Sequence, residues 1–418
     1  MDLMDQVDLM ERVCDRENLI KAYKRVRANK GAPGVDGMTV EELPDHLREH
    51  WPAIREQLMA GTYKPQPVKR VEIPKPGGGE RPLGIPTIRD RVVQTATKLV
   101  VEPIFEADLE PNVHGYRPKR SALDAIQQVH KLLKQGYTDV VDADLSKYFD
   151  TIPHQAMMQC VSRRIVDRNV LRLIKLWLKT PVVHDDGKGR GGKVTGGRKS
   201  TCGTPQGGVI SPLLANVYMN RFLKYWRMQR CDEVFRAHVV SYADDFVILS
   251  RGKAEQALEW TTAVMERLGL RLNETKTVIR DGRKETFNFL GYTFGRCYST
   301  QDGHAYIGTR PSKQSVQKLC REISEATSRR RALLDAETVV KGLNRKLIGW
   351  ANYFCLGPVS KAYRTIDQHA SARLRRWLCK KHKQSSRGTR RYPDAYLYET
   401  LGLQRLSVST RNLPWAKA

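Results

Sequence analysis

The segment AHVVSYADDFVILS, residues 237–250, decides the fold of the central part of this chain. Apolar and β-branched residues stand on both sides of two adjacent aspartates, Asp244 and Asp245, and this pattern predicts a hairpin with the aspartates at its tight turn. Two unpaired carboxylates beside hydrophobic strands are costly unless a cation neutralises them. An isolated Asp-Asp pair in a hairpin is more often turn chemistry than a metal site, so the rest of the sequence must decide between these interpretations.

A second β-branched segment, TDVVDADL at residues 138–145, predicts another strand that ends in acidic residues. If this strand lies beside the hairpin, Asp144 joins Asp244 and Asp245 in one site, and Asp142 is an alternative because it has the same strand parity. Three carboxylates without Cys or His nearby favour a hard ion, so magnesium fits better than zinc. A pair of such ions serves in-line nucleotidyl transfer, because it activates a 3′-hydroxyl and stabilises charge on the phosphoryl oxygens.

The overall charge indicates a polyanionic partner. The 418 residues include 72 Lys+Arg and 45 Asp+Glu, a net charge of +27, whereas the 40% hydrophobic content is ordinary for a folded protein of two or three domains. The eight cysteines are scattered without a C-x-x-C pair, which argues against structural zinc and for a reducing compartment. No run of about 18 apolar residues is present, so we expect no membrane partner.

The positive charge is concentrated toward the C-terminus, where residues 301–418 hold 24 Lys+Arg and 8 Asp+Glu. Within this region residues 372–391 carry nine basic residues and no acidic one, with Trp377 and Tyr392 placed to stack on bases. We expect this segment to bind nucleic acid, and the alternative is a solvated helix face. The residues assigned to this binding are Arg373, Arg375, Arg376, Lys380, Lys381 and Lys383.

Periodicity elsewhere predicts helices interspersed with the strands up to about residue 300, and hence an α+β domain. Beyond residue 300 the pattern is helical, with Leu343, Leu347, Trp350 and Phe354 on one apolar face. The earlier elements expected are a helix within 18–30 that ends at Gly31, a loop at 31–37, helices at 122–135 and 169–178, and an exposed, mobile loop at 185–200.

Taken together, these motifs resemble those of reverse transcriptases and follow the same order along the chain. YADD (242–245) resembles the palm signature, and DADLSKYFDTIPH (142–154) resembles the first palm motif. The resemblance selects Asp144 over Asp142, implies that Asp144, Asp244 and Asp245 bind two Mg²⁺ ions, and makes Phe149 the steric gate beneath the sugar. GTPQGGVISPLLAN (203–216) resembles the motif along the template and incoming nucleotide, which Gln206 and Gly207 would contact.

Three further segments extend the resemblance. IPKPGGGERPLGIP (73–86) matches the fingers segment in which Lys75 and Arg81 would grip the nucleotide triphosphate. LGLRLNETKT (268–277) matches the motif whose lysine, here Lys276, approaches the leaving pyrophosphate. FNFLGYTF (287–294) matches the primer-grip region.

The type of reverse transcriptase is indicated by segments outside the palm. NKGAPGVDG (29–37) resembles the N-terminal extension motif of group II intron-encoded enzymes, and HGYRP (114–118) fits the same family. LNRKLIGWANYF (343–354) resembles the thumb or maturase domain, which in that family binds intron RNA and the template–primer duplex. No H-N-H endonuclease with paired cysteines follows, as in the compact class C proteins, so we expect the primer to come from a nicked or replicating strand.

The resemblance implies an α+β right-hand polymerase, with fingers and an antiparallel palm sheet, followed by an α-helical domain. The expected parts are an N-terminal extension at 1–62, fingers and palm at 63–300, a thumb/maturase domain at 301–370 and a basic tail at 371–418. The implied function is RNA-directed DNA polymerisation that copies a group II intron during retrohoming, together with binding of the intron RNA to assist splicing. The implied partners are the intron RNA, an RNA template with a DNA primer, dNTPs and target DNA, in a cytoplasmic ribonucleoprotein.

Two alternatives remain open. One is a reverse transcriptase that works without an intron, in repair or phage defence. The other is a splicing-only maturase whose polymerase site is idle, although an unused site has no reason to keep Asp144, Asp244 and Asp245 together. The oligomeric state is not indicated.

Overall fold

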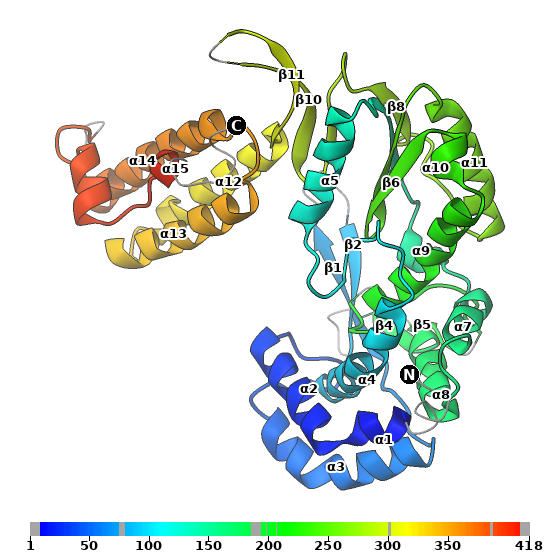
Figure 1. The fold of residues 1–418 in the computed structure, drawn as a ribbon. Coiled ribbons are helices and arrows are strands. Elements are labelled where there is room, and N and C mark those ends of the chain that lie inside the picture. Colours follow the sequence, from blue (N-terminus) through cyan, green and yellow to red (C-terminus); the bar gives the residue numbers. More distant parts are fainter. Residues whose placement is uncertain are drawn as a thin grey trace. The chain divides into compact units, whose positions relative to one another are not determined.

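The computed structural model describes residues 9–74, 80–184, 194–197, 199–205, 207–299, 302–384 and 388–409. The chain divides into two compact units, each built from three segments of the sequence, and Figure 1 shows their elements. The first unit comprises Met1–Ser121, Ala143–Ile248 and Glu255–Val278, and the second comprises Ala122–Asp142, Leu249–Ala254 and Ile279–Ala418.

The first unit begins with helices, and the sequence explains where the second of them starts and stops. The carboxylate of Asp15 accepts hydrogen bonds from the first-turn amides of this helix, and Lys30, at φ 46°, ends it directly before Gly31, as the sequence predicts. The helices of the N-terminal part are α1 (Leu9–Cys14), α2 (Arg16–Asn29), α3 (Leu43–Met59) and α4 (Ile88–Glu106). The later ones are α6 (Tyr148–Thr151), α7 (His154–Ser162), α8 (Arg168–Leu178), α9 (Ser211–Met228), α10 (Cys231–Val234) and α11 (Ala254–Arg267).

A four-stranded sheet of order β2-β1-β4-β5 also lies in the first unit. Its strands are β1 (Val68–Pro74), β2 (Glu80–Ile85), β4 (Pro181–His184) and β5 (Val194–Gly196). β1 and β2 are antiparallel, as expected for the predicted fingers hairpin, whereas β1 and β4 are parallel. The predicted loop at 185–200 thus includes the short strand β5, and its residues 185–193 and 198 lie outside the described residues.

The sheet that carries the predicted acidic residues has the order β6-β7-β3-β8. Its strands are β3 (Asp139–Asp144), β6 (Ala237–Tyr242), β7 (Asp245–Ser250) and β8 (Val278–Asp281). Both strand predictions are therefore correct, and the strand that begins at Asp245 is the neighbour of the strand that ends at Asp144. The residues of β7 after Asp245 are all buried, which accounts for the continuous apolar run in the sequence.

The second unit contains α5 (Ala122–Lys134), a three-stranded sheet and a group of helices. The sheet has the order β11-β10-β9, with β9 (Phe287–Phe289), β10 (Tyr292–Tyr298) and β11 (Ala305–Pro311). β10 and β11 form the long hairpin visible in Figure 1. The sequence pattern predicts only helix after residue 300, so β11 was not predicted. The burial of its residues does not alternate along the strand, and neither does the apolar character of its sequence.

The helical part of the second unit has one core. Its helices are α12 (Lys313–Ala326), α13 (Ala336–Tyr353), α14 (Ser360–Lys381) and α15 (Leu406–Ser409), with a 3₁₀ turn at Arg329–Arg331 and a π turn at Tyr396–Thr400. Leu343 and Leu347 of α13 are buried in this core, as the apolar face predicted. The same core takes in Trp377 and Tyr392. The segment from 371 onward therefore packs as part of the helical domain, and residue 370, the expected boundary, lies inside α14.

No helix in the described part of the chain combines the length and apolar character needed to cross a membrane.

Candidate active site

The predicted acidic turn is present at the tip of the β6–β7 hairpin. β6 ends at Tyr242 and β7 begins at Asp245, so Ala243 and Asp244 make the turn. Ala243 adopts a positive φ of 59° and is buried, while the side chain of Asp244 is half-buried and that of Asp245 is exposed. A non-glycine residue at positive φ persists only where its surroundings hold it, so the neighbours of Ala243 matter.

The HGYRP loop that follows α4 lies directly against this turn. Ser241 donates its amide to Asn112 O (3.0 Å) and accepts from the His114 amide (2.8 Å), so the loop is bonded to β6 like a short extra strand. A Cβ atom added to Gly115 would lie only 2.3 Å from the backbone nitrogen of Ala243. Only glycine therefore fits at residue 115 while the turn keeps this position.

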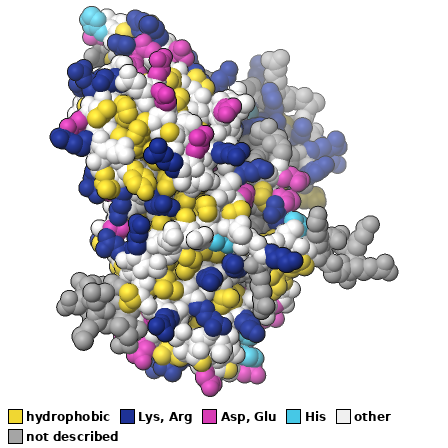
Figure 2. Space-filling model, turned by 90° about the vertical axis from the view of Figure 1, so that its right-hand side faces the viewer, with side chains coloured by type: hydrophobic (Ala, Val, Ile, Leu, Met, Phe, Trp, Pro, Cys, Tyr) yellow, Lys and Arg dark blue, Asp and Glu magenta, His cyan; other side chains and the backbone are white. Residues whose placement is uncertain are grey.

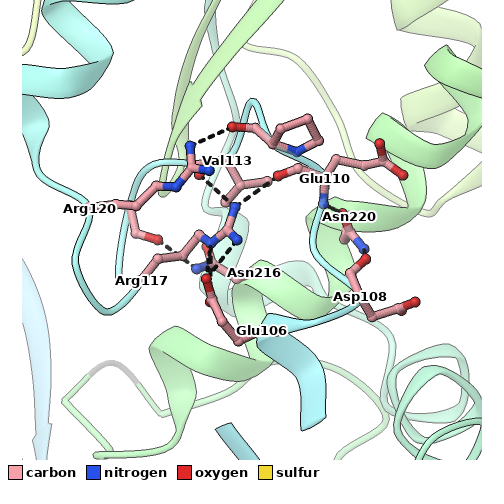
Figure 3. A network of polar contacts seen from close by, with 10 residues as sticks. Glu106, Asp108, Glu110, Val113, Arg117, Arg120, Asn216 and Asn220 are labelled. Atoms are coloured by element: carbon pink, nitrogen blue, oxygen red, sulfur yellow. Dashed lines mark hydrogen bonds and ion pairs between the residues drawn. The ribbon is translucent and has the colours of Figure 1, made fainter. Parts of the chain in front are cut away.

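An ion pair between buried Arg117 and half-buried Glu106 holds the HGYRP loop in shape (Figure 3). The Arg117 guanidinium, 6% exposed, binds the Glu106 carboxylate with its shortest contact at 2.6 Å and also donates to the carbonyl groups of Glu110 and Val113. Asn216 of α9 donates to Gly115 O at 2.6 Å. Because a buried guanidinium that loses its partner is costly, this network fixes the backbone that supports the acidic turn.

The start of the same loop is tied to α9 by a second set of contacts. Lys224 donates to the Asp108 carboxylate at 2.6 Å, and Arg164 pairs with it as well. Partial burial alone would raise the pKa of Asp108, but the hydrogen bonds from the two cations hold this pKa below its usual value. Asn220 accepts from the Glu110 amide and donates to Asp108 O, as Figure 3 shows.

Asp144, the last residue of β3, is held by the segment that follows α11. Its Oδ2 atom lies 3.0 Å from Lys276 Nζ and 3.2 Å from Asn273 Nδ2, and its backbone oxygen accepts from the Asn273 amide at 2.8 Å. Lys276 thus meets Asp144, one of the residues predicted to bind metal. Asn273 had no predicted role. Its position three residues before Lys276 was the only feature of the sequence that could have indicated a shared contact with Asp144.

The fit of a metal ion can be judged from the donor chemistry. Among the described residues no three Asp, Glu, His or Cys side chains form a group that could hold a metal ion. Asp144 and Asp245 nevertheless end and begin neighbouring strands, with Asp244 in the turn between β6 and β7. All three supply carboxylate oxygens, and the Lys276 ammonium already stands as a cation at Asp144. Carboxylate oxygens are the donors that a hard divalent ion prefers, and in this structure the Lys276 ammonium pairs with one of them.

The first palm motif and the glycine-rich motif are joined through their backbones. Phe149, 6% exposed, accepts at its carbonyl from the Thr204 amide (2.7 Å), and Gly203 donates to Ile152 O (2.9 Å). His154 Nε2 lies 2.6 Å from Gly203 O. The structure therefore brings Phe149 to the base of the glycine-rich motif.

Gly207 shows why the glycine-rich motif needs small residues. Its φ is 109°, and a Cβ atom there would lie 2.3 Å from the backbone oxygen of Gly84 in β2. Gln206, predicted beside it, lies outside the described residues.

Tyr148, next to Phe149 in the first palm motif, had no predicted role. Its hydroxyl donates to Ala215 O at 2.6 Å in a fully buried position. Burial raises the pKa of the Tyr148 hydroxyl well above its ordinary value, and the charges of Tyr218 and Asp244 add to the shift. Tyr148 therefore stays a neutral phenol that ties α6 to the backbone of α9.

Of the two predicted triphosphate residues, Lys75 lies outside the described residues, as do residues 76–79. Arg81 is in β2, opposite Ile73 of β1, on the strand that closes the fingers hairpin. The Arg81 side chain lies outside the described part of the chain, so the triphosphate assignment of both residues stays a prediction.

The six basic residues predicted to bind nucleic acid fall into two groups. Arg373 donates to Ser324 O (2.8 Å), Arg375 pairs with Asp394 (2.6 Å), and Lys381 donates to Leu334 O (2.7 Å). These three therefore hold the helical domain together. The side chains of Arg376, Lys380 and Lys383 are exposed.

Basic side chains are also common elsewhere on the surface. Figure 2 shows Lys and Arg side chains spread widely over one face, with Asp and Glu among them. A net charge of +27 over the whole chain, with basic side chains dispersed on this face, suits a long polyanion better than a small anion.

Two family models match the chain. Residues 73–294 match the family described as reverse transcriptase (RNA-dependent DNA polymerase), and residues 316–393 match the group II intron, maturase-specific domain. The second match extends through α12–α14 and past residue 370, in agreement with the continuous core of the helical domain.

Curated relatives point in the same direction. Protein YkfC of Escherichia coli is 35% identical over 73% of this chain and 88% of its own length. The COX1/OXI3 intron 2 protein of Saccharomyces cerevisiae is 27% identical over 68% of this chain, and the group II intron-encoded protein LtrA of Lactococcus lactis is 34% identical over 49%. The chain spans only 38% and 32%, respectively, of these two intron proteins.

Proposed function

The chain belongs to the group II intron reverse transcriptase and maturase family, and on that premise we propose that it extends a DNA primer along an RNA template by two-metal nucleotidyl transfer. The observation that carries this proposal is the acidic turn. Asp244 and Asp245 lie at a hairpin tip next to the strand that ends in Asp144, and the HGYRP loop holds that tip from behind.

Asp144, Asp244 and Asp245 would hold two Mg²⁺ ions. When bound, the ions would activate the primer 3′-hydroxyl as a nucleophile and stabilise the negative charge on the phosphoryl oxygens. The part of the protein is to keep the carboxylates in place: Asn273 holds the Asp144 backbone, and Gly115 leaves room for the Ala243 amide. A fixed arrangement saves the cost of reorganising these groups during the reaction.

The remaining residues of the site would bind the nucleotide and the template. Phe149, anchored at Thr204 and packed at the base of the glycine-rich motif, would set the space beneath the sugar. Gly207, with Gln206 before it, would lie along the nucleotide and template, and the absence of a side chain at Gly207 lets β2 approach this motif closely at Gly84. Lys75 and Arg81 would bind the triphosphate, and Lys276 would approach the leaving pyrophosphate.

The finer biological role follows from the maturase-specific region. We propose that the helical domain binds a group II intron RNA, that this binding assists splicing, and that the intron is then copied at target DNA in a cytoplasmic ribonucleoprotein. Arg376, Lys380 and Lys383 are the exposed members of the predicted basic segment and would contribute phosphate contacts. Host-repurposed activity in repair or phage defence is the alternative, and the presence or absence of a folded intron RNA around the gene decides between them.

The direct test uses the purified full chain with a labelled DNA primer annealed to an RNA template. With Mg²⁺ and dNTPs we expect extension to the template end, and a cognate intron RNA should splice faster when the protein is present. Tight RNA binding and splicing without any primer extension would contradict the polymerase proposal and favour the splicing-only maturase.

Lys276 offers a prediction on metal binding. Because its ammonium group pairs with Asp144 at 3.0 Å, Lys276→Met should tighten Mn²⁺ binding in the absence of nucleotide by up to about fivefold, since an exposed ion pair is worth up to about 1 kcal/mol. Electron paramagnetic resonance of free Mn²⁺ measures this affinity directly. The same variant should bind dNTPs more weakly, because Lys276 is proposed to turn to the pyrophosphate.

The matched control for Lys276→Met is Lys284→Met, which removes the same charge from an exposed pair with Asp281 and should leave Mn²⁺ affinity unchanged. Asp144→Asn should weaken Mn²⁺ binding in either background. Equal Mn²⁺ affinities in the wild-type protein and Lys276→Met would show that Lys276 does not compete for the site.

A further inference from the structure

The segment between α12 and α13, residues 328–335, is here called the arginine loop. It presents Arg329, Arg330 and Arg331 in one 3₁₀ turn, all with exposed side chains. Within the described part of the chain, no hydrogen bond or ion pair engages their three guanidinium groups. Leu333, two residues further on, is 96% exposed, more than any other large apolar residue that the structure describes.

The arginine loop is held firmly from behind by residues that the sequence had suggested for nucleic-acid binding. Lys381 of α14 donates to Ala332 O (3.1 Å) and Leu334 O (2.7 Å), and its ammonium group lies 5.6 Å from the centre of the Trp377 ring. Arg373 donates to the carbonyl of Ser324 near the end of α12. A preformed loop loses less conformational entropy on binding than a loose one.

The other end of the arginine loop is fixed by a helix cap. Asp335 accepts from the Thr338 amide (2.7 Å) and from its hydroxyl, which ties the loop to the first turn of α13. The Asp335 carboxylate is therefore occupied, and Glu337 is paired with Lys341 at 2.6 Å. Asp335 and Glu337, the acidic residues at the start of α13, thus bind other groups and form no ion pair with the three arginines.

This combination indicates one kind of partner. Adjacent, exposed guanidinium groups on one turn complement the negative charge of successive phosphates. Leu333 gains nothing for the fold by standing in water, but an apolar side chain beside phosphate-binding arginines can pack against an unstacked base. An RNA segment with unpaired nucleotides satisfies both features at once.

We propose that the arginine loop is an RNA-binding element in which Arg329, Arg330 and Arg331 bind phosphates and Leu333 packs against an unpaired base. The proposal rests on the proposed function in one respect, namely that the nucleic acid bound by the helical domain is RNA. It assigns Lys381 and Arg373 a positioning role behind the loop.

The test measures binding of the full chain to an RNA hairpin with a bulge and to a fully paired RNA of equal length, across a range of KCl concentrations. The triple variant Arg329→Gln, Arg330→Gln, Arg331→Gln should weaken binding to both RNAs on the order of tenfold and reduce the salt slope by about 2, since each phosphate contact contributes roughly 0.7–0.9. Leu333→Ser should weaken binding to the bulged RNA alone by a few-fold and leave the salt slope unchanged.

The matched control is the triple variant Arg48→Gln, Arg230→Gln, Arg283→Gln, which removes three exposed arginines that are already paired with carboxylates. It should bind both RNAs like the wild-type protein. An equal loss in the two triple variants, or wild-type binding by the arginine-loop triple, overturns the proposal. If the wild-type chain binds no RNA, the proposed function itself fails, so the two failures are distinguishable.

Leu333→Ser also separates RNA from other occupants. If Leu333 served to contact a lipid surface or an apolar protein partner, Leu333→Ser would not change the affinity for bulged RNA. Wild-type binding of bulged RNA by Leu333→Ser would therefore overturn the assignment of this leucine to a base. The melting temperature should remain unchanged in the arginine-loop triple variant and in Leu333→Ser, because the exposed side chains that they replace make no hydrogen bond or ion pair within the described part of the chain.

Discussion

Asp244→Ala is expected to abolish extension of a DNA primer on an RNA template while RNA affinity stays nearly intact. Asp244 lies in the hairpin turn, half-exposed, so its loss removes a carboxylate from the proposed metal site without opening the core. A rate loss of about 10³-fold or more corresponds to about 4 kcal/mol of lost transition-state stabilisation, a reasonable magnitude for a missing metal ligand.

Single-nucleotide incorporation at saturating primer–template measures the effect of Asp244→Ala, and RNA binding is measured on the same preparation. The control is Asp232→Ala in α10, which removes an exposed carboxylate of the same unit and should extend primers normally. Normal extension by Asp244→Ala would refute the metal assignment. Splicing of a cognate intron by this variant would show that splicing and polymerisation are separable.

Gly115→Ala is expected to lower primer extension by at least about 100-fold, although residue 115 bears no chemical group of its own. The new methyl group would lie 2.3 Å from the backbone nitrogen of Ala243, and the obstacle is backbone rather than a flexible side chain. Either the HGYRP loop or the acidic turn must shift, and a displacement of about 1 Å at a catalytic group costs on the order of 10²-fold. The strain should also lower the free energy of unfolding by about 1–3 kcal/mol.

The loss of stability in Gly115→Ala must be separated from its effect on the turn. Ile174→Val in α8, a fully buried position of the same unit, should cost about 0.5–1.5 kcal/mol and leave primer extension unchanged. Both variants are compared by thermal unfolding and by incorporation rate well below the melting temperature. Wild-type incorporation by Gly115→Ala would mean that the acidic turn tolerates a shift of its support.

Much of the local structure could be predicted from the sequence. The β-branched runs at 138–145 and 237–250 correspond to β3 and to the β6–β7 hairpin, and the apolar face of α13 is buried as its periodicity predicts. Such predictions succeed because the hydrophobic period and the turn chemistry act over a few neighbouring residues. The mixed helix and sheet architecture and the family followed from these motifs and their order.

The basic segment 372–391 is a part of the chain whose contacts could not be predicted from the sequence. The segment is strongly basic, but a run of lysines and arginines in the sequence does not show which of these side chains face solvent. In the structure Arg373, Arg375 and Lys381 bind carbonyl and carboxylate groups of the helical domain. The free arginines at 329–331 occur in a turn that carries no recognised motif.

The sequence by itself determined that the chain carries two acid-tipped strands, a basic C-terminal region and the motif order of a reverse transcriptase, because each of these is written in neighbouring residues. Only the tertiary structure decided that Gly115 supports the acidic turn, that Lys276 neutralises Asp144, and that Lys381 braces the arginine loop. The physical reason is separation along the chain: these groups lie tens to more than a hundred residues apart, and their contacts exist only after the core has packed.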